Sequence, residues 1–92
     1  METTELVAWA AEHVTDGVAL DVGAQYGAFC IPLLEAVPGL ARCYAFEPNP
    51  DFVAVLRRRA VKLGVGDRLV VVKAAVMDTA GKAILKVPLD RG

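Results

Sequence analysis

Apolar and polar positions along the chain follow two spacings, one typical of helices and one typical of buried strands. Near the start, apolar side chains recur at i, i+3, i+4 and i+7, which predicts a helix within residues 1–17. This stripe consists of Leu6, Trp9, Ala10 and His13. Residues 18–20 then form a continuous apolar run that leads into Asp21 and a segment with two glycines. We interpret this run as a buried strand that ends in a glycine turn.

The same spacings continue through the rest of the chain. Residues 28–37 are expected to be helical, although Pro32 would remove an early hydrogen bond and bend the first turns. Residues 42–46 are predicted to be a second strand. Asn49 is a good N-cap for a further helix that ends near Gly64. Its expected buried side chains are Phe52, Val55, Leu56, Ala60 and Leu63.

Two more strands, over residues 69–74 and 83–87, complete the order β-α-β-α-β plus a further strand. Short connections between such elements imply right-handed crossovers and a parallel sheet. We therefore expect an α/β fold, a partial Rossmann-like doubly wound sheet over residues 18–87, preceded by the helix of residues 1–17. The first strand is expected inside the sheet and the third at an edge.

A complete doubly wound sheet has another strand on the free side of the first one. We expect residues 1–92 to lack that strand, which would leave an apolar edge open. The chain is then a single partial domain that is truncated or is completed by a partner.

Composition and charge narrow the class of protein. Of the 92 residues 55% are hydrophobic and 23% are charged, which argues against disorder and suits one small domain. The net charge of −1 gives no electrostatic reason to expect a nucleic acid or an anionic membrane as a partner. Arg57, Arg58 and Arg59 would spread around a helix, so we expect most of their charge to face water. An acidic start and the lack of a long apolar run favour a cytoplasmic protein.

The cysteines and the single histidine invite chemical roles that their positions do not support. Cys30 and Cys43 lie in apolar segments without CxxC spacing, so we interpret them as reduced core thiols and expect no metal site. His13 precedes the first strand, whereas ligands of α/β sheets bind beyond the carboxyl ends of strands. We therefore assign His13 to packing or to the surface.

A glycine turn after a buried strand, followed by an acid at the end of the next strand, indicates a nucleotide-type site. Gly23 and Gly27 leave no Cβ between the backbone and a ligand. Glu47 lies 24 positions after Gly23, close to the offset of about 20 residues at which a strand-end acid binds a ribose diol. These features predict a half-site for a cofactor that contains adenosine.

Two features favour S-adenosylmethionine over a dinucleotide. Gln25 and Ala28 stand where the pattern G-x-G-x-x-G, counted from Gly23, requires glycine. Asp21 would repel a pyrophosphate, whereas S-adenosylmethionine has no phosphate and carries a sulfonium and an amine. The two carboxylate oxygens of Glu47 can accept hydrogen bonds from both ribose hydroxyls.

Three segments resemble the FkbM-type class I S-adenosylmethionine-dependent methyltransferases. They are residues 21–27 (DVGAQYG), residues 44–50 (YAFEPNP) and residues 74–78 (AAVMD) with Gly81. The AFEPNP stretch is the most specific of them. The resemblance spans residues 18–87, and it covers only the N-terminal, cofactor-binding half of a typical family member.

The resemblance implies that the glycine turn wraps the methionyl part, Asp21 steadies it, Glu47 holds the ribose and the third segment flanks the adenine. Family members methylate hydroxyls, which implies O-methyl transfer to a small molecule or glycan. Residues that bind the acceptor and take its proton would follow Gly92, so no catalytic residue is assigned and the 92-residue chain alone is expected to be inactive. The cofactor-binding residues implied are Asp21, Gly23, Ala24, Gln25, Tyr26, Gly27, Glu47, Pro48, Ala75, Val76 and Asp78.

Other interpretations stay open. A binding module without catalysis would self-associate through the open strand edge, and a dinucleotide oxidoreductase would need a different glycine pattern. The residues also allow a purely structural interpretation. Gly23 and Gly27 would then serve a tight connection, and Asp21 would cap the following helix. Glu47 would be solvated, and Asp78 would be an ordinary turn residue.

Overall fold

The computed structural model describes residues 2–75 and 81–85 of the chain. Its elements follow in the order α1 (Thr3–His13), β1 (Gly17–Val22), α2 (Cys30–Ala36), β2 (Leu40–Phe46), α3 (Pro50–Lys62), a short 3-10 turn η1 (Gly66–Arg68), β3 (Leu69–Val72) and β4 (Gly81–Leu85). This order confirms the predicted α/β, Rossmann-like class. Residues 86–87 of the expected last strand lie outside the described residues.

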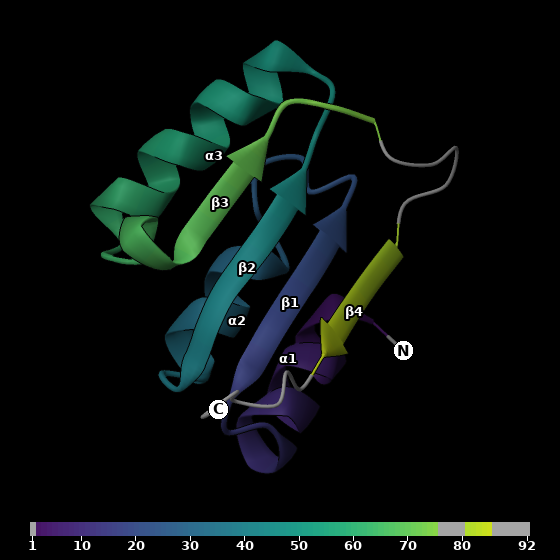
Figure 1. Ribbon diagram of the computed structural model, residues 1–92, viewed down its shortest axis with the longest axis vertical. Helices are drawn as coiled ribbons and strands as arrows, with labels where there is room; N and C mark the ends of the chain where they lie inside the picture. The colour runs from purple at the N-terminus through teal and green to yellow at the C-terminus, as the bar shows by residue number, and fades with distance from the viewer. Residues whose placement is uncertain (1, 76–80, 86–92) are drawn as a thin grey trace, which may run out of the picture.

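The four strands form one sheet in the order β3-β2-β1-β4 (Figure 1). β1 pairs with β2 and β2 with β3 in parallel, so β1 lies inside the sheet and β3 at an edge, as predicted. The expectation of an open edge beside β1 is wrong. β4 pairs with β1 antiparallel, from Val18 opposite Leu85 to Val22 opposite Gly81. Residues 73–80 are too few for a parallel crossover, which needs a dozen residues or more, and β4 therefore runs antiparallel.

The three helices lie on one side of the sheet, behind it in the view of Figure 1. The strand side chains that face them are buried, and they include Ala19, Asp21, Cys43 and Ala45. No described helix covers the opposite side. A row of partly exposed apolar side chains, Leu20, Tyr44 and Val70, crosses that side in register.

The N-terminal helix packs through a different stripe from the predicted one. Ala10 is buried and Leu6 packs partly against the core, but Trp9 is 45% exposed. The His13 ring stacks on Trp9 with 4.9 Å between centroids, and its Nδ1 is 2.8 Å from the Trp9 carbonyl oxygen. The packed side therefore runs through Leu6 and Ala10 to Val14, which leaves Trp9 at the surface.

Helix α2 begins at Cys30, two residues later than expected. Pro32 is then the third helical residue, where the backbone N–H has no partner within the helix in any case, so the predicted bend is unnecessary. At the other end, the Arg68 guanidinium donates to the carbonyl oxygen of Leu34 and, at 3.4 Å, to that of Val37. The Leu34 carbonyl is one that the end of the helix leaves free, whereas the Val37 carbonyl also accepts from the Leu40 N–H at 3.0 Å.

The ends of α3 match the prediction. The Asn49 side chain accepts from the Asp51 N–H at 2.9 Å, with Pro50 as the first helical residue. Gly64 has a φ of +78°, and the next N–H, of Val65, bonds the Ala60 carbonyl at 2.9 Å.

The predicted core side of α3 is only partly right. The buried side chains are Val53, Leu56 and Ala60. Leu63 is 42% exposed, while Phe52 and Val55 are half-buried.

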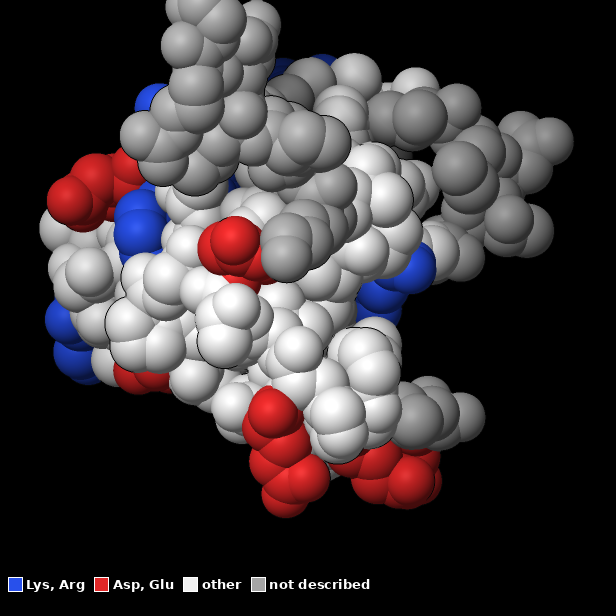
Figure 2. Space-filling view, turned by 60° about the horizontal axis from the view of Figure 1, so that its bottom comes forward, with Lys and Arg blue, Asp and Glu red and all other residues white. Residues whose placement is uncertain are grey.

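Charged side chains lie in small groups on one face of the molecule. On the face drawn in Figure 2, acidic and basic residues alternate with wider uncharged areas. Within residues 2–75 and 81–85, no helix is both long and apolar enough to cross a membrane.

Candidate functional site

The glycine loop, residues 23–27, connects β1 to α2 at the carboxyl end of the sheet. The N–H groups of Gly23 and Ala24 both donate to the Phe46 carbonyl at the end of β2, at 2.8 and 3.1 Å. The N–H of Gly27 donates to the Ala24 carbonyl at 2.9 Å. These bonds fix the loop against the second strand.

Gly27 has to be glycine for two reasons. Its φ of +91° lies in the left-handed region, which side chains with a Cβ rarely adopt. A Cβ at this position would also lie 2.6 Å from Leu56 Cδ1 and 2.8 Å from Ile31 Cδ1. The loop therefore approaches both flanking helices closely. This close packing is compatible with the structural interpretation as well as with a ligand site.

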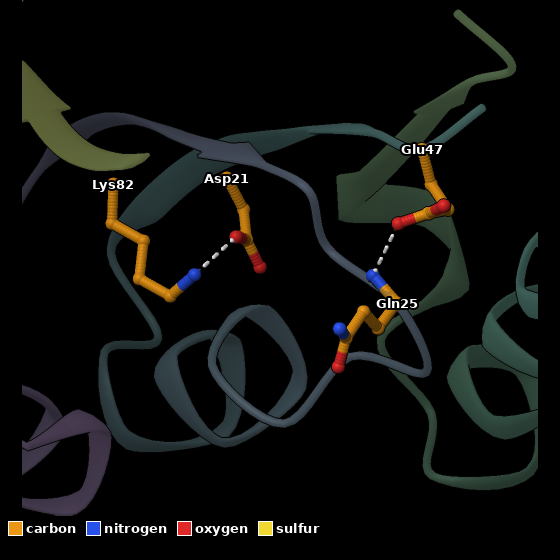
Figure 3. Close-up of polar contacts among 4 residues, drawn as sticks. All are labelled: Asp21, Gln25, Glu47 and Lys82. Carbon is orange, nitrogen blue, oxygen red and sulfur yellow. Dashed lines mark hydrogen bonds and ion pairs between the residues drawn. The ribbon is translucent and has the colours of Figure 1, made fainter. Parts of the chain in front are cut away.

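Glu47 is buried at the end of β2, with 5% of its surface exposed, and so it is not solvated. Its Oε1 accepts from the Gln25 N–H at 2.8 Å (Figure 3), and its Oε2 accepts from the Asn49 N–H at 3.0 Å. A carboxylate has about four lone-pair sites, so each oxygen keeps one acceptor position. Gln25 has a φ of +53°, and its side chain points away from Glu47 in Figure 3. The Gln25 backbone, and not its side chain, orients Glu47.

Asp21 lies at the end of β1 with 1% of its side chain exposed. Lys82 of β4 binds Asp21 Oδ1 at 2.9 Å (Figure 3). Asp21 Oδ2 is buried and has no hydrogen-bond partner among the described residues. Asp21 does not cap α2, because the N-cap residue, Phe29, is followed by a helix without a side-chain cap. A buried, unsatisfied carboxylate oxygen is costly, and a positively charged donor is the partner that suits it.

The two cysteines are free, buried thiols, which confirms their predicted place in the core. Hydrogen bonding with Cys43, burial and the negative charge of Asp21 raise the pKa of the Cys30 thiol far above its ordinary value. Cys30 therefore stays a neutral thiol at neutral pH, as expected of a core cysteine. Among the residues that the structure describes, no group of three His, Cys, Asp or Glu side chains is placed to hold a metal.

The remaining predicted residues are placed less centrally. Tyr26 is 46% exposed on the glycine loop, and Pro48 is exposed beside Glu47. Ala75, also exposed, follows β3 at the same carboxyl end of the sheet as the glycine loop and Glu47. Val76 and Asp78 lie outside the described residues. His13 precedes β1 at the opposite end of the sheet from the glycine loop, as predicted.

Two residues of this region were missed by the sequence analysis. Lys82 reaches Asp21 only because β4 pairs antiparallel with β1, opposite Asp21. Arg59 donates to the backbone carbonyl of Tyr26 across the gap between α3 and the glycine loop. Neither contact has a local sequence signal, since each depends on how distant elements pack.

Several solved methyltransferases share this fold. The chain is similar to an RNA methyltransferase from Salinibacter ruber in complex with S-adenosyl-L-homocysteine, with 23% identity and a TM-score of 0.62 over 79% of this chain and 44% of that one. It is also similar to precorrin-6y C5,15-methyltransferase from Geobacter metallireducens GS-15, with 26% identity and a TM-score of 0.61 over 76% and 38%. For the protein described as StiE O-MT, the identity is 17% and the TM-score 0.64 over 79% and 26%.

These similarities show that the chain has the Rossmann-like fold of S-adenosylmethionine-dependent methyltransferases. The chain spans less than half the length of each of the three structures. No model of a protein family matches the chain, and no curated protein matches it in sequence.

Proposed function

We propose that this chain is the cofactor-binding half of an S-adenosylmethionine-dependent methyltransferase. The observation that carries the proposal is the state of Glu47. A carboxylate at the end of β2 is buried, is fixed by two backbone N–H groups and keeps one acceptor position on each oxygen. The two vicinal hydroxyls of a ribose can donate the two further hydrogen bonds that such a carboxylate is able to accept.

Asp21 gives the proposal a second support. Its Oδ2 is buried without a partner among the described residues, while Lys82 occupies Oδ1. The ammonium of the methionyl group is a donor of the right charge for this oxygen. S-adenosylmethionine, when bound, supplies an electrophilic methyl group. The described residues would bind and orient the cofactor, with the loop residues 23–27 around its methionyl part and Pro48 and Ala75 nearer the base. The family resemblance adds Val76 and Asp78, which lie outside the described residues.

We further propose an acceptor hydroxyl on a small molecule or glycan, and hence O-methyl transfer, in a cytoplasmic protein. The support is the resemblance of residues 21–27 and 44–50 to FkbM-type methyltransferases. The free, buried state of both cysteines suits a reducing compartment. The solved structures of this fold include an RNA methyltransferase and a precorrin methyltransferase, so the fold alone does not select the acceptor.

Calorimetric titration of residues 1–92 with S-adenosylhomocysteine and with NAD tests the cofactor. We expect binding of S-adenosylhomocysteine and none of NAD. Glu47→Gln replaces one acceptor oxygen by an NH₂ that faces a backbone donor, so the affinity should fall by about 10- to 100-fold. Glu35→Gln, at an exposed position of α2, is the matched control and should change nothing. Tighter binding of NAD than of S-adenosylhomocysteine would contradict the proposal.

A second candidate function is self-association without catalysis. We expected self-association through the free edge of β1, but β4 occupies that edge. On the side of the sheet without a described helix, a partly exposed apolar row remains, formed by Leu20, Tyr44 and Val70. A second copy would bury this row. Sedimentation would then show a dimer that Val70→Lys dissociates, in a protein that binds no S-adenosylhomocysteine.

A further inference from the structure

One side of helix α3 faces the glycine loop and shares Leu56 with the side that packs in the core. Phe52, Leu56 and Arg59 follow at i, i+4 and i+7, so they lie along one side of the helix. The Phe52 ring lies 6.5 Å from the Tyr26 ring, centroid to centroid, in a tilted arrangement. Leu56 lies against Gly27, with its Cδ1 2.6 Å from the position that a Cβ would take. The loop is therefore shaped by the helix that follows β2 as well as by its own helix.

Arg59 makes two contacts with the loop residue Tyr26. Its Nη1 donates to the Tyr26 backbone carbonyl, and its guanidinium lies 5.7 Å from the centroid of the Tyr26 ring. Arg59 is half-buried, whereas its neighbours Arg57 and Arg58 are exposed. The expectation that the charge of this triplet faces water therefore holds for two of the three arginines. Arg59 is the exception.

Arg59 contacts the glycine loop next to its strained residue, Gln25. Gln25 has a φ of +53°, the one positive φ of a non-glycine residue in the described chain, and this conformation costs about 1 kcal/mol or more. The Tyr26 side chain is 46% exposed and does not anchor the loop in the core. The Gln25 N–H must nevertheless point at Glu47 Oε1. Arg59 holds the peptide group between Tyr26 and Gly27, two peptide groups further along the chain.

We propose that Arg59 is a positioning residue, which holds residues 25–27 so that the Gln25 N–H fixes Glu47 in its ligand-binding orientation. The inference rests on the proposed function, because Glu47 is there the ribose-binding group. A guanidinium suits the task better than an ammonium, since its several donors let it bind a carbonyl while it stays close to an aromatic ring.

The experiment compares Arg59→Met with Arg58→Met, a matched change at an exposed position of the same helix. Amide hydrogen exchange of the unliganded chain is the first measurement, and it needs no cofactor. We expect the amides of Gln25 and Gly27 to exchange about tenfold faster in Arg59→Met, because one charge-assisted hydrogen bond is lost. The amides of β1 and β2 should keep their protection. Arg58→Met should match the wild type throughout.

Calorimetry with S-adenosylhomocysteine is the second measurement. Arg59→Met should weaken binding by about tenfold, and Arg59→Lys should restore part of the loss, since lysine keeps the charge and one donor. Unchanged exchange at Gln25 and Gly27 would overturn the inference, and so would faster exchange with unchanged affinity. If the wild type itself does not bind S-adenosylhomocysteine, the proposed function fails, while the exchange data still decide whether Arg59 holds the loop.

A uniform loss of protection over the whole sheet in Arg59→Met would indicate a merely structural role and would also overturn the inference. Should Arg59→Met not fold, Tyr26→Leu replaces it. This change removes the contact between guanidinium and ring at a side chain that is 46% exposed, and keeps the backbone bond. It should speed exchange at Gln25 by about two- to threefold, in proportion to the weaker contact. No change in that variant would count against Arg59.

Discussion

Gly27 and Gly64 share a left-handed backbone but differ in their surroundings. Gly64, with a φ of +78°, has no atom within 4 Å of a Cβ built on it, whereas Gly27 lies against Leu56 and Ile31. Gly64→Ala should therefore lower the free energy of unfolding by about 1–2 kcal/mol through backbone strain alone. Gly27→Ala adds a steric clash in the core and should cost about 1–3 kcal/mol more.

Urea unfolding of both variants separates the two contributions. The difference between Gly27→Ala and Gly64→Ala reports the steric part, because the backbone conformation is similar in both. Equal losses in the two variants would mean that Leu56 and Ile31 move aside without cost, and that the loop packs less tightly against its helices than the structure indicates.

At the residue scale, the sequence was most informative where a role depends on neighbours in the chain. Glycines after a strand, Asp21 at a strand end and Glu47 at the next one follow from local order, and all three lie where they were predicted. The hydrogen-bond and ion-pair partners of Asp21 and Glu47 could not be predicted from local order. The position of Lys82 opposite Asp21 requires the register of β4 on β1, which no local pattern encodes.

At the element scale, Arg68 joins three parts of the chain. From the end of η1 it donates to carbonyls at the end of α2 and, at 3.5 Å, to that of Leu40, where β2 begins. Arg68→Met keeps much of the side-chain volume but removes the donors. We expect a loss of about 1.5–3 kcal/mol in unfolding free energy, as for hydrogen bonds to a charged group.

The control for this prediction is Arg58→Met on the exposed side of α3, which should stay within about 0.5 kcal/mol of the wild type. Thermal or urea unfolding gives both values. If Arg68→Met unfolds like the control, the carbonyls at the end of α2 are satisfied equally well by water.

Helix ends were predicted well where side chains specify them and poorly where packing does. Asn49 and Gly64 bracket α3 as expected, because a cap and a left-handed glycine act locally. The start of α2 was placed two residues early, since the glycine loop, held by the end of β2, extends further than its sequence suggests. On α1, Trp9 is exposed although it belongs to the predicted stripe, and Val14 packs against the core in place of His13. Spacing alone therefore did not identify the packed side of this helix.

At the scale of the whole molecule, the pair of Lys82 and Asp21 ties the last described strand to the first. Asp21 is 1% and Lys82 27% exposed at the side chain, so the pair is only partly screened by water. Lys82→Met leaves a buried carboxylate without its counter-ion and should cost about 3 kcal/mol, near the low end for a broken buried pair. Urea unfolding measures this loss.

A double-mutant cycle gives the interaction its own test. Asp21→Asn removes the charge that Lys82 neutralises, so adding Lys82→Met to it should cost much less than Lys82→Met alone. Additive losses in the double variant would show that the two side chains do not interact across the sheet, whatever their distance.

The parallel strands of the sheet were predicted from the sequence, whereas the pairing of β4 was not. The parallel core of β1, β2 and β3 follows from helices that separate the strands, because such connections impose order and direction. The pairing of β4 depends on the length of residues 73–80 and on the free side of β1, two features at different places in the chain. The shortness of that connection accounts for the antiparallel direction of β4, whereas its place beside β1 depends on the free side of that strand.

The pairing of β4 with β1 also has a consequence for biosynthesis. β1 and β2 are complete once residue 46 has emerged from the ribosome, but the outer side of β1 waits for residue 85. At about 5–20 residues per second, this interval is roughly 2–8 s. During it, the nascent chain carries an unpaired strand edge of the kind that chaperones shield and that neighbouring chains can join. The lifetime of that intermediate is set by the speed of translation, so slow codons between β2 and β4 would prolong it without changing a single residue of the finished protein.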